Sequence, residues 1–375
     1  MKVAIITITD GQNYGNRLQN YALQEVLKSL GFEVLTIRRK NHHDKKRIIR
    51  VIKRNIKRIL GRPYGKYRLI RKKRFDDFNS KYIQFDRAVL QDNKAPKDIK
   101  NRFRYFVVGS DQVWNAGFRI IREDLLNYLA SFADPGQRIS YAASFGTDTI
   151  PPESEDIFRE ELSRFKAISV REEAGIELLH SLGLQGSVVL DPTMLLTAEQ
   201  WALVGKKPSY ILDTPYVLTY FLGGRDQRII RECIDTVSAG KKVINLENAS
   251  VPESRIENIE FYSTGPAEFI WLIFHAECVI TDSFHATAFS IIFHRPFLVF
   301  DRKAINNSYK MGNRIETLLG RFNLEKNKAG LDIVPSFPEP YDIDRVDKIL
   351  SIEREKSISY LKRALSNEKD HWKKI

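Results

Sequence analysis

Short apolar runs and amphipathic stretches alternate along the first part of the chain. The run KVAIITI at 2–8 is typical of a buried β-strand, and residues 15–31 carry apolar side chains at helical spacing that ends at Gly31. A second β-branched run, FEVLTI, follows at 32–37. A strand, a helix and a strand in this order form a βαβ unit, which predicts a parallel sheet.

The same alternation continues to about residue 193, lapses into a loop-like stretch around 192–212, and starts again at residue 216. Strands are predicted at 105–110, 138–146, 167–170, 187–193, 216–222, 241–247, 278–282 and 296–300. This pattern predicts an α/β fold with two Rossmann-like, doubly wound domains at 1–200 and 201–340, followed by C-terminal helices at 341–375. Ligands of such folds bind at the carboxyl ends of the strands, so the site is expected in the cleft that the domains face.

A histidine stands where one of these strands should end. The sequence CVITD at 278–282 is strand-like, and the helix that follows would have Asp282 or Ser283 as its N-cap. His285 then lies in the strand-to-helix turn, where the free amides of the helix start attract anions. An imidazole beside a bound anion is favoured in its charged form and can act as a general acid. A capping turn also tolerates a histidine that has no such role.

The composition narrows the classes of function. The chain of 375 residues has a formal charge of +13, which favours acidic partners such as phosphates, carboxylates, nucleic acid or anionic lipid. The two distant cysteines, Cys233 and Cys278, form neither a disulfide framework nor a zinc motif, and the scattered histidines predict no metal site and no cofactor. Because no segment has the pattern of a signal peptide or a transmembrane helix, we expect a cytoplasmic protein.

Much of the positive charge is confined to a basic segment, residues 38–74. It holds eighteen Lys and Arg residues against the single acid Asp44, which leaves the rest of the chain near −4. At 100° per residue its apolar side chains fall on one arc of roughly 120°, opposite a basic face. These apolar residues are Ile48, Ile49, Ile52, Ile56, Ile59 and Leu60. Such a helix can lie on an anionic membrane surface, but a helix that packs its isoleucines on the domain fits equally well.

Six short motifs are spaced along nearly the whole chain. They are NYGNRLQNYALQEVLKSLG at 13–31, VVGSDQVWN at 107–115, YAASFG at 141–146, SVREEAG at 169–175, VVLDPT at 188–193 and VITDSFHATAFSIIFHRPFLVF at 279–300. In this order they resemble the polysaccharide pyruvyl transferase family. The resemblance implies a fold similar to GT-B glycosyltransferases and the transfer of a carboxyethylidene group from phosphoenolpyruvate to a sugar diol, as a cyclic ketal. The acceptor would be a polysaccharide or its lipid-linked precursor.

The resemblance also assigns roles on the donor side. Phosphoenolpyruvate becomes electrophilic at C2 only after C3 is protonated, and His285 would be the acid over C3. Arg171 resembles a family arginine near the anionic donor, although a surface or capping arginine fits the sequence as well. Ser283 stands where several members have a further arginine, so the missing cation would come from Arg314 or from Lys303.

The acceptor side is expected in the N-terminal domain. The turn after the first strand has neither a GxGxxG nor a P-loop pattern, but it offers three amide side chains suited to sugar hydroxyls: Asn13, Asn16 and Gln19. The strand at 105–109 is followed by Asp111, which could orient or deprotonate an attacking hydroxyl, by Gln112, and by Trp114 as an aromatic platform. Asp111 could instead be a buried Asx residue that fixes its loop.

Two other functions fit parts of the pattern. A GT-B glycosyltransferase would share the architecture and the cleft, but it would release a nucleoside diphosphate from a nucleotide sugar. A nucleic-acid-binding protein would use the basic segment as a phosphate-binding arm. Because the charge is confined to one segment with few aromatic residues, nucleic acid is not the expected partner.

Overall fold

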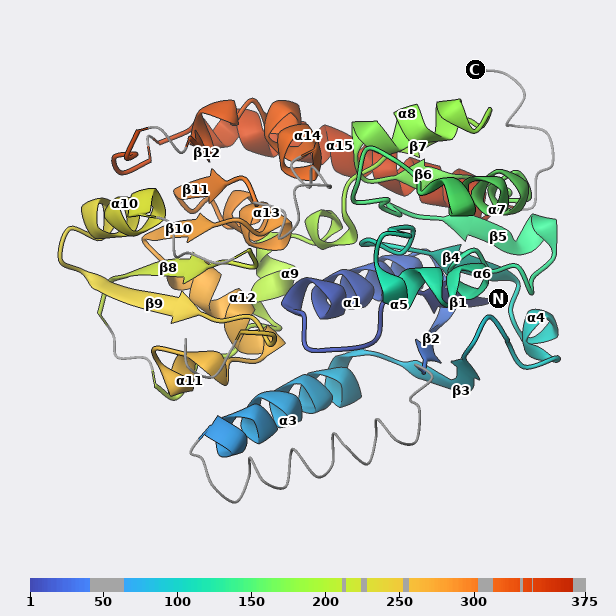
Figure 1. Cartoon of the computed structure of the whole chain (residues 1–375), viewed down its shortest axis with the longest axis horizontal. Coiled ribbons are helices and arrows are strands. Elements are labelled where there is room, and N and C mark those ends of the chain that lie inside the picture. Colours follow the sequence, from blue (N-terminus) through green and yellow to red (C-terminus); the bar gives the residue numbers. More distant parts are fainter. Residues whose placement is uncertain are drawn as a thin grey trace.

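The computed structural model describes residues 1–40, 64–210, 214–223, 228–251, 256–302, 313–330, 333–338 and 340–366. Within them, the first half of the chain forms a five-stranded parallel sheet with the spatial order β3-β2-β1-β4-β5 (Figure 1). Its strands are β1 (Lys2–Ile6), β2 (Glu33–Arg39), β3 (Phe85–Leu90), β4 (Tyr105–Val108) and β5 (Arg138–Ser140). A short parallel pair, β6 (Ser169–Val170) and β7 (Ser187–Val188), continues this sheet beyond β5 through isolated bridges.

The second half of the described chain forms another five-stranded parallel sheet, in the order β12-β11-β10-β8-β9. Its strands are β8 (Tyr216–Tyr220), β9 (Lys242–Leu246), β10 (Cys278–Thr281), β11 (Phe297–Phe300) and β12 (Lys328–Ala329). The predicted fold class of two Rossmann-like sheets is confirmed. The strand order reverses between β1 and β4 in one sheet and between β8 and β10 in the other, and ligands of doubly wound folds bind at such switch points.

Helices cover both sheets (Figure 1). In chain order they are α1 (Tyr14–Ser29), α3 (Tyr64–Tyr82), α4 (Ile99–Arg102), α5 (Arg119–Arg122), α6 (Leu125–Tyr128), α7 (Pro152–Leu162), α8 (Glu173–Ser181), α9 (Ala198–Ala202), α10 (Arg228–Ser238), α11 (Ile259–Tyr262), α12 (Pro266–His275), α13 (Phe284–Ile292), α14 (Asn313–Phe322) and α15 (Ile343–Ala364). Single 3-10 turns lie at Pro135–Gln137, Pro192–Leu195 and Glu325–Asn327. The long α15 returns from the second sheet to the first, where the hydroxyl of Tyr360 donates to the carbonyl of Ser140 at 2.9 Å.

One apolar core runs through both halves of the molecule. Tyr14 of α1 stacks on Phe269 of α12 with ring centroids 4.5 Å apart. Trp201 of α9 contacts Tyr21 of the first half and Phe289 of the second. The sequence of α12 is almost entirely apolar, as expected for a helix enclosed by neighbouring layers. A continuous apolar interface of this kind restrains movement of one domain against the other.

Candidate active site

His285 lies in the first turn of α13, as the sequence predicts. Ser283 is the N-cap of this helix: its Oγ accepts from the amide of Ala286 at 3.5 Å, and its own amide donates to Thr281 Oγ1 at 3.0 Å. Asp282 instead accepts from the backbone amides of Leu222 and Gly223, which anchors the turn after β8. The imidazole therefore projects from a turn that is fixed on both sides, and it is buried.

The imidazole packs against the backbone of α1 in the other domain. A Cβ atom on Gly15 would lie 2.0 Å from His285 Nδ1, so only glycine leaves room for the ring. Gly15 is in the first turn of α1, whose N-cap Asn13 accepts from the amide of Asn16 at 3.2 Å. The switch points of the two sheets thus meet at His285.

An arginine–carboxylate cluster surrounds the histidine. We use this name for Asp111, Arg171, Glu172, Asp191 and Arg314, all of which are buried. Arg171 donates from Nη1 to Asp191 Oδ2 at 2.7 Å and from Nη2 to Asp111 Oδ1 at 3.1 Å. Arg314 Nη1 lies 3.8 Å from Asp111 Oδ1, and His285 Nε2 lies 3.7 Å from Asp191 Oδ2. The guanidinium of Arg171 also covers the ring of Phe284 at 4.4 Å, which joins the two domains.

The two aspartates of the cluster are held in their charged form. Ser110 Oγ donates to Asp191 Oδ2 at 3.0 Å, and the amide and hydroxyl of Thr193 donate to Oδ1. Burial opposes the charge of Asp191, but His285, Arg171 and the Thr193 bonds outweigh it and lower its pKa to about 2. Burial likewise opposes the charge of Asp111, but Arg171, His285 and Arg314 lower its pKa below the ordinary value. Both side chains are therefore weak proton acceptors.

Burial has the opposite effect on the charge of the histidine and of one arginine, because it favours their neutral forms. Burial lowers the pKa of His285 below 6.5, against the attraction of Asp191 and Asp111. Burial and then the charge of Arg171 lower the pKa of Arg314 to about 10. An anion placed against these groups would favour the charged form of both.

Several buried polar atoms of this region have no hydrogen-bond partner in the described structure. They are Asn16 Oδ1, Arg171 Nε, Glu172 Oε2, His285 Nε2 and Arg314 Nε. An unsatisfied buried polar group costs about 1–3 kcal/mol and is rare in folded proteins. Their concentration where the two domains meet indicates a ligand site that offers both hydrogen-bond donors and acceptors.

Two residues expected on the acceptor side have structural positions instead. The side chain of Gln19 is fully buried, and its Oε1 accepts from the amide of Ser110 at 3.0 Å, so it fastens α1 to the turn after β4. Trp114 packs on Phe145 inside the N-terminal domain and donates from Nε1 to the carbonyl of Tyr128 at 3.2 Å. It is a core residue rather than an exposed platform, because the turn after β4 folds back onto the sheet.

The other expected residues lie at the meeting point or cannot be placed. Gln112 is buried beside the cluster, and its Oε1 accepts from Asn115 Nδ2 at 2.8 Å. Asn13 and Ser283 cap the two helices that converge there. Lys303 and the isoleucine arc of the basic segment lie outside the described residues.

The sequence reasoning missed Asp191, Glu172 and the steric role of Gly15. Glu172 stands just after the predicted strand at 167–170, in SVREE, and Asp191 stands near the end of the predicted strand at 187–193, in VVLDPT. Since parallel strands end at one edge of a sheet, acids directly after strands could have been grouped with Asp111. Nothing in the sequence shows which ring approaches Gly15.

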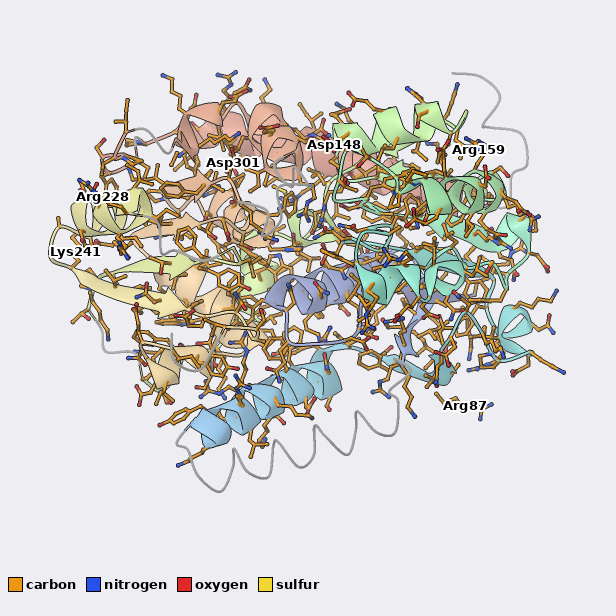
Figure 2. The ribbon with its side chains drawn as sticks, in the orientation of Figure 1. Arg87, Asp148, Arg159, Arg228, Lys241 and Asp301 are labelled. Carbon is orange, nitrogen blue, oxygen red and sulfur yellow. The ribbon has the colours of Figure 1, made fainter. Side chains whose placement is uncertain are left out.

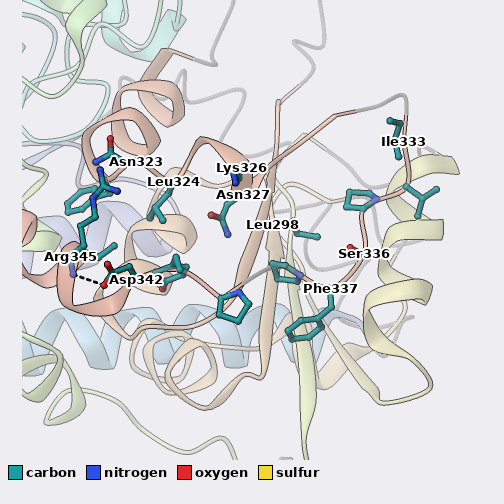
Figure 3. Close-up of a pocket in the computed structure, with 17 residues that line it drawn as sticks. Leu298, Asn323, Leu324, Lys326, Asn327, Ile333, Ser336, Phe337, Asp342 and Arg345 are labelled. Carbon is teal, nitrogen blue, oxygen red and sulfur yellow. Dashed lines mark hydrogen bonds between the residues drawn. The ribbon is translucent and has the colours of Figure 1, made fainter.

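One further pocket of the described structure lies away from this cluster. A pocket of about 750 Å³ lies between the end of α14, the start of α15 and residues 333–338 and 340–341 (Figure 3). It is lined by apolar side chains such as Leu298 and Phe337, and none of the candidate residues reaches it. Among the described residues, no three His, Cys, Asp or Glu side chains come together as a metal centre requires.

Comparison with known proteins identifies the family. A family model described as polysaccharide pyruvyl transferase matches residues 13–303, more than half of the chain. The chain belongs to the polysaccharide pyruvyl transferase family. The matched region contains Gly15, Asn16, His285 and the arginine–carboxylate cluster apart from Arg314. A comparison with curated protein sequences found no match.

Solved structures place this pyruvyl transferase family member among GT-B-like folds. It resembles UDP-GlcNAc 2-epimerase from Neisseria meningitidis, with TM-score 0.50, 12% identity, and 95% of this chain and 100% of that chain covered. The likeness to the Methanocaldococcus jannaschii enzyme has TM-score 0.50 and 13% identity, over 97% of this chain and 99% of that chain. At such identities the likeness shows the fold alone. No helix among the described residues combines the length and apolarity needed to cross a membrane.

Proposed function

We propose that the protein transfers a carboxyethylidene group from phosphoenolpyruvate to two hydroxyls of a sugar and releases phosphate. The family supports the reaction type, and the unpartnered buried atoms around His285 carry the assignment of the site. A donor with a phosphate and a carboxylate would satisfy the hydrogen-bond donors Arg314 Nε and a protonated His285 Nε2, and the charge of Arg171 would add to their attraction.

His285 supplies the proton that makes the donor reactive. Protonation of C3 leaves positive charge at C2, which the first sugar hydroxyl attacks, and phosphate then departs before the second hydroxyl closes the ketal. The neighbouring Asp191 lies 3.7 Å from His285 Nε2 and favours the imidazolium that must form. For Asp111 the sequence left open a role toward the attacking hydroxyl or in its own loop. Because Asp111 bonds Arg171 and lies near Arg314, it orients these cations and does not remove a proton.

The acceptor is a sugar that enters from the N-terminal side. Asn16 has a buried oxygen without a partner, which would accept from a sugar hydroxyl, and Gln112 and Asn13 lie at the same sheet edge. The acceptor can be lipid-linked, in which case the protein works at the cytoplasmic membrane surface. The exposed face of α3, with Lys66, Leu69, Lys72 and Lys73, is the described part of the basic segment that would face the lipid.

The test is incubation of the protein with phosphoenolpyruvate and a panel of aryl glycosides that carry free diols. Phosphate release together with a glycoside product heavier by one carboxyethylidene group is expected. A parallel panel of nucleotide sugars addresses the alternative GT-B glycosyltransferase, which would release a nucleoside diphosphate. Release of nucleoside diphosphate without any ketal would overturn the proposal.

A further inference from the structure

The pyruvyl transfer proposed above needs a group that accepts the proton of the attacking sugar hydroxyl. Three buried carboxylates of the arginine–carboxylate cluster are candidates. Asp191 accepts four bonds, from Arg171, Ser110 and both donors of Thr193, and it faces His285. Asp111 accepts from Arg171 and faces Arg314. The cations beside these two aspartates make them poor proton acceptors.

Glu172 is bound differently from the two aspartates. Its Oε1 accepts from Ser144 Oγ at 2.8 Å and from the amide of Gly146 at 3.2 Å, so the carboxylate is held in one orientation. Its Oε2 is buried and has no hydrogen-bond partner. One oxygen of this side chain therefore positions the group, and the other is available to a ligand.

A neighbouring hydrogen-bond donor narrows the chemistry of the ligand that this oxygen can bind. Arg171 Nε lies 4.0 Å from Glu172 Oε2, and it too is buried without a partner. One of these atoms requires an acceptor and the other requires a donor. A hydroxyl group supplies both at once, whereas a phosphate or carboxylate oxygen would be repelled by the glutamate.

We propose that Glu172 is the catalytic base that takes the proton of the first acceptor hydroxyl. This inference rests on the proposed function. The hydroxyl oxygen forms a bond to C2 of phosphoenolpyruvate as its proton passes to Glu172 Oε2, and the C2–C3 π pair takes the proton of His285 at C3. Phosphate then leaves C2 with the C–O electron pair. The second hydroxyl takes its place, and the proton of that hydroxyl goes to the departing phosphate.

The experiment compares Glu172→Gln with the matched control Glu173→Gln. Glutamine keeps the carbonyl oxygen that Ser144 and Gly146 need, while Glu173 is the exposed next residue. Calorimetric titration with phosphoenolpyruvate should give a Kd within about threefold of wild type in both variants, which also shows that they fold. With phosphoenolpyruvate and p-nitrophenyl glycosides, kcat of Glu172→Gln should fall at least about 100-fold, the usual contribution of a general base.

The pH profile separates a base from a structural residue. Wild type and Glu173→Gln should lose kcat/KM for the glycoside as the pH falls and a carboxylate is protonated, and Glu172→Gln should lack this acid limb. Glu172→Asp should retain the limb at a reduced rate. Wild-type kcat in Glu172→Gln, or an unchanged acid limb, would overturn the assignment of Glu172. Absence of ketal formation by the wild type itself would overturn the proposed function instead.

Discussion

The contact between Gly15 and His285 is the sharpest steric constraint at the residue scale. Gly15→Ala places a Cβ atom 2.0 Å from His285 Nδ1, so the ring must turn or α13 must move. Since a displacement of about 1 Å can cost on the order of 100-fold in rate, we expect kcat to fall at least tenfold. Donor affinity should change little, because Arg171 and Arg314 stay in place.

The control for this variant is Gly136→Ala. A Cβ at Gly136 meets nothing within 4 Å, so this change should leave kcat and the melting temperature unaltered. Steady-state kinetics of both variants, with thermal melts, make the comparison. Undiminished turnover in a folded Gly15→Ala protein would show that the position of the imidazole does not depend on its contact with Gly15.

The lowered pKa of His285 gives a second prediction at the same scale. Burial keeps the free imidazole neutral at pH 7, because its pKa lies below 6.5. A bound anion opposes this shift, so phosphoenolpyruvate should be bound together with a proton. Titration calorimetry in two buffers of different ionisation enthalpy measures this uptake. This proton uptake should disappear in His285→Asn. It should persist in the control His294→Gln, because His294 lies at the surface and pairs with Asp347. Proton release, or no exchange at pH 7, would contradict a role as acid.

The sequence predicted which residues lie at the site better than it predicted which of them contact one another. His285, Arg171 and Arg314 were expected and lie together, because each stands at a strand end or a helix start on the cleft side. The pairing of His285 with Asp191 joins two domains, and no local pattern records it. Trp114 was expected to be exposed at the site because it follows a strand, but its side chain is buried in the core.

At the scale of elements, α3 links the two domains. The side chain of Arg71 is fully buried and donates to the carbonyls of Glu247 at 3.1 Å and Tyr262 at 2.7 Å, and also to Gln12 in the turn that carries the acceptor residues. Arg74 pairs with Glu268 at 2.8 Å. Part of the charge of the basic segment is therefore used inside the fold.

Removal of this link should be costly. Arg71→Met leaves several buried carbonyls without donors, at about 1–3 kcal/mol each, so the free energy of unfolding should fall by at least about 3 kcal/mol. Lys73→Met on the exposed side of the same helix breaks only a surface pair with Asp77 and should cost no more than about 0.5 kcal/mol. Urea unfolding of both proteins tests this, and equal losses would show that Arg71 is not a structural link.

Helices and strands with a strong apolar periodicity were predicted close to their observed bounds, whereas short strands toward the sheet edges were not. The expected strand at 2–8 and helix at 15–31 correspond to β1 and α1. The strand β3 was overlooked, although FDRAVL alternates buried and exposed side chains, because it has only one neighbour and charged residues interrupt it. The run at 138–146 was predicted as one strand, but only Arg138–Ser140 is β5, since the rest turns across the sheet edge to reach the site.

For the whole molecule, the distribution of charge determines which face could make the proposed membrane contact. The basic segment carries +17 by sequence, against about −4 for the remainder. Arg39 is neutralised by Asp10 and Asp124, and Arg74 by Glu268, so these cations are not available to lipid. Lys66, Lys72 and Lys73 remain exposed on α3, where Lys72 and Lys73 form only surface pairs with Asp76 and Asp77, and half of the Leu69 side chain is exposed between them.

If the exposed face of α3 rests on anionic lipid, each well-placed cation contributes about 1 kcal/mol to binding. This contribution falls as the Debye length shortens from about 10 Å at 0.1 M salt to about 3 Å at 1 M.

The test removes three charges from α3 in one triple variant, Lys66→Gln, Lys72→Gln and Lys73→Gln. The matched control removes three cations elsewhere on the surface: Arg159, Arg228 and Lys241, which Figure 2 shows at the rim away from α3. Co-sedimentation with vesicles that contain phosphatidylserine should fall at least fivefold for the first protein and much less for the second, because only local charges act within a Debye length. Equal losses in both triple variants would mean that net charge alone attracts the protein, whereas binding that does not fall with salt would mean that charge does not drive it. Either result would contradict a membrane contact made through the cations of α3.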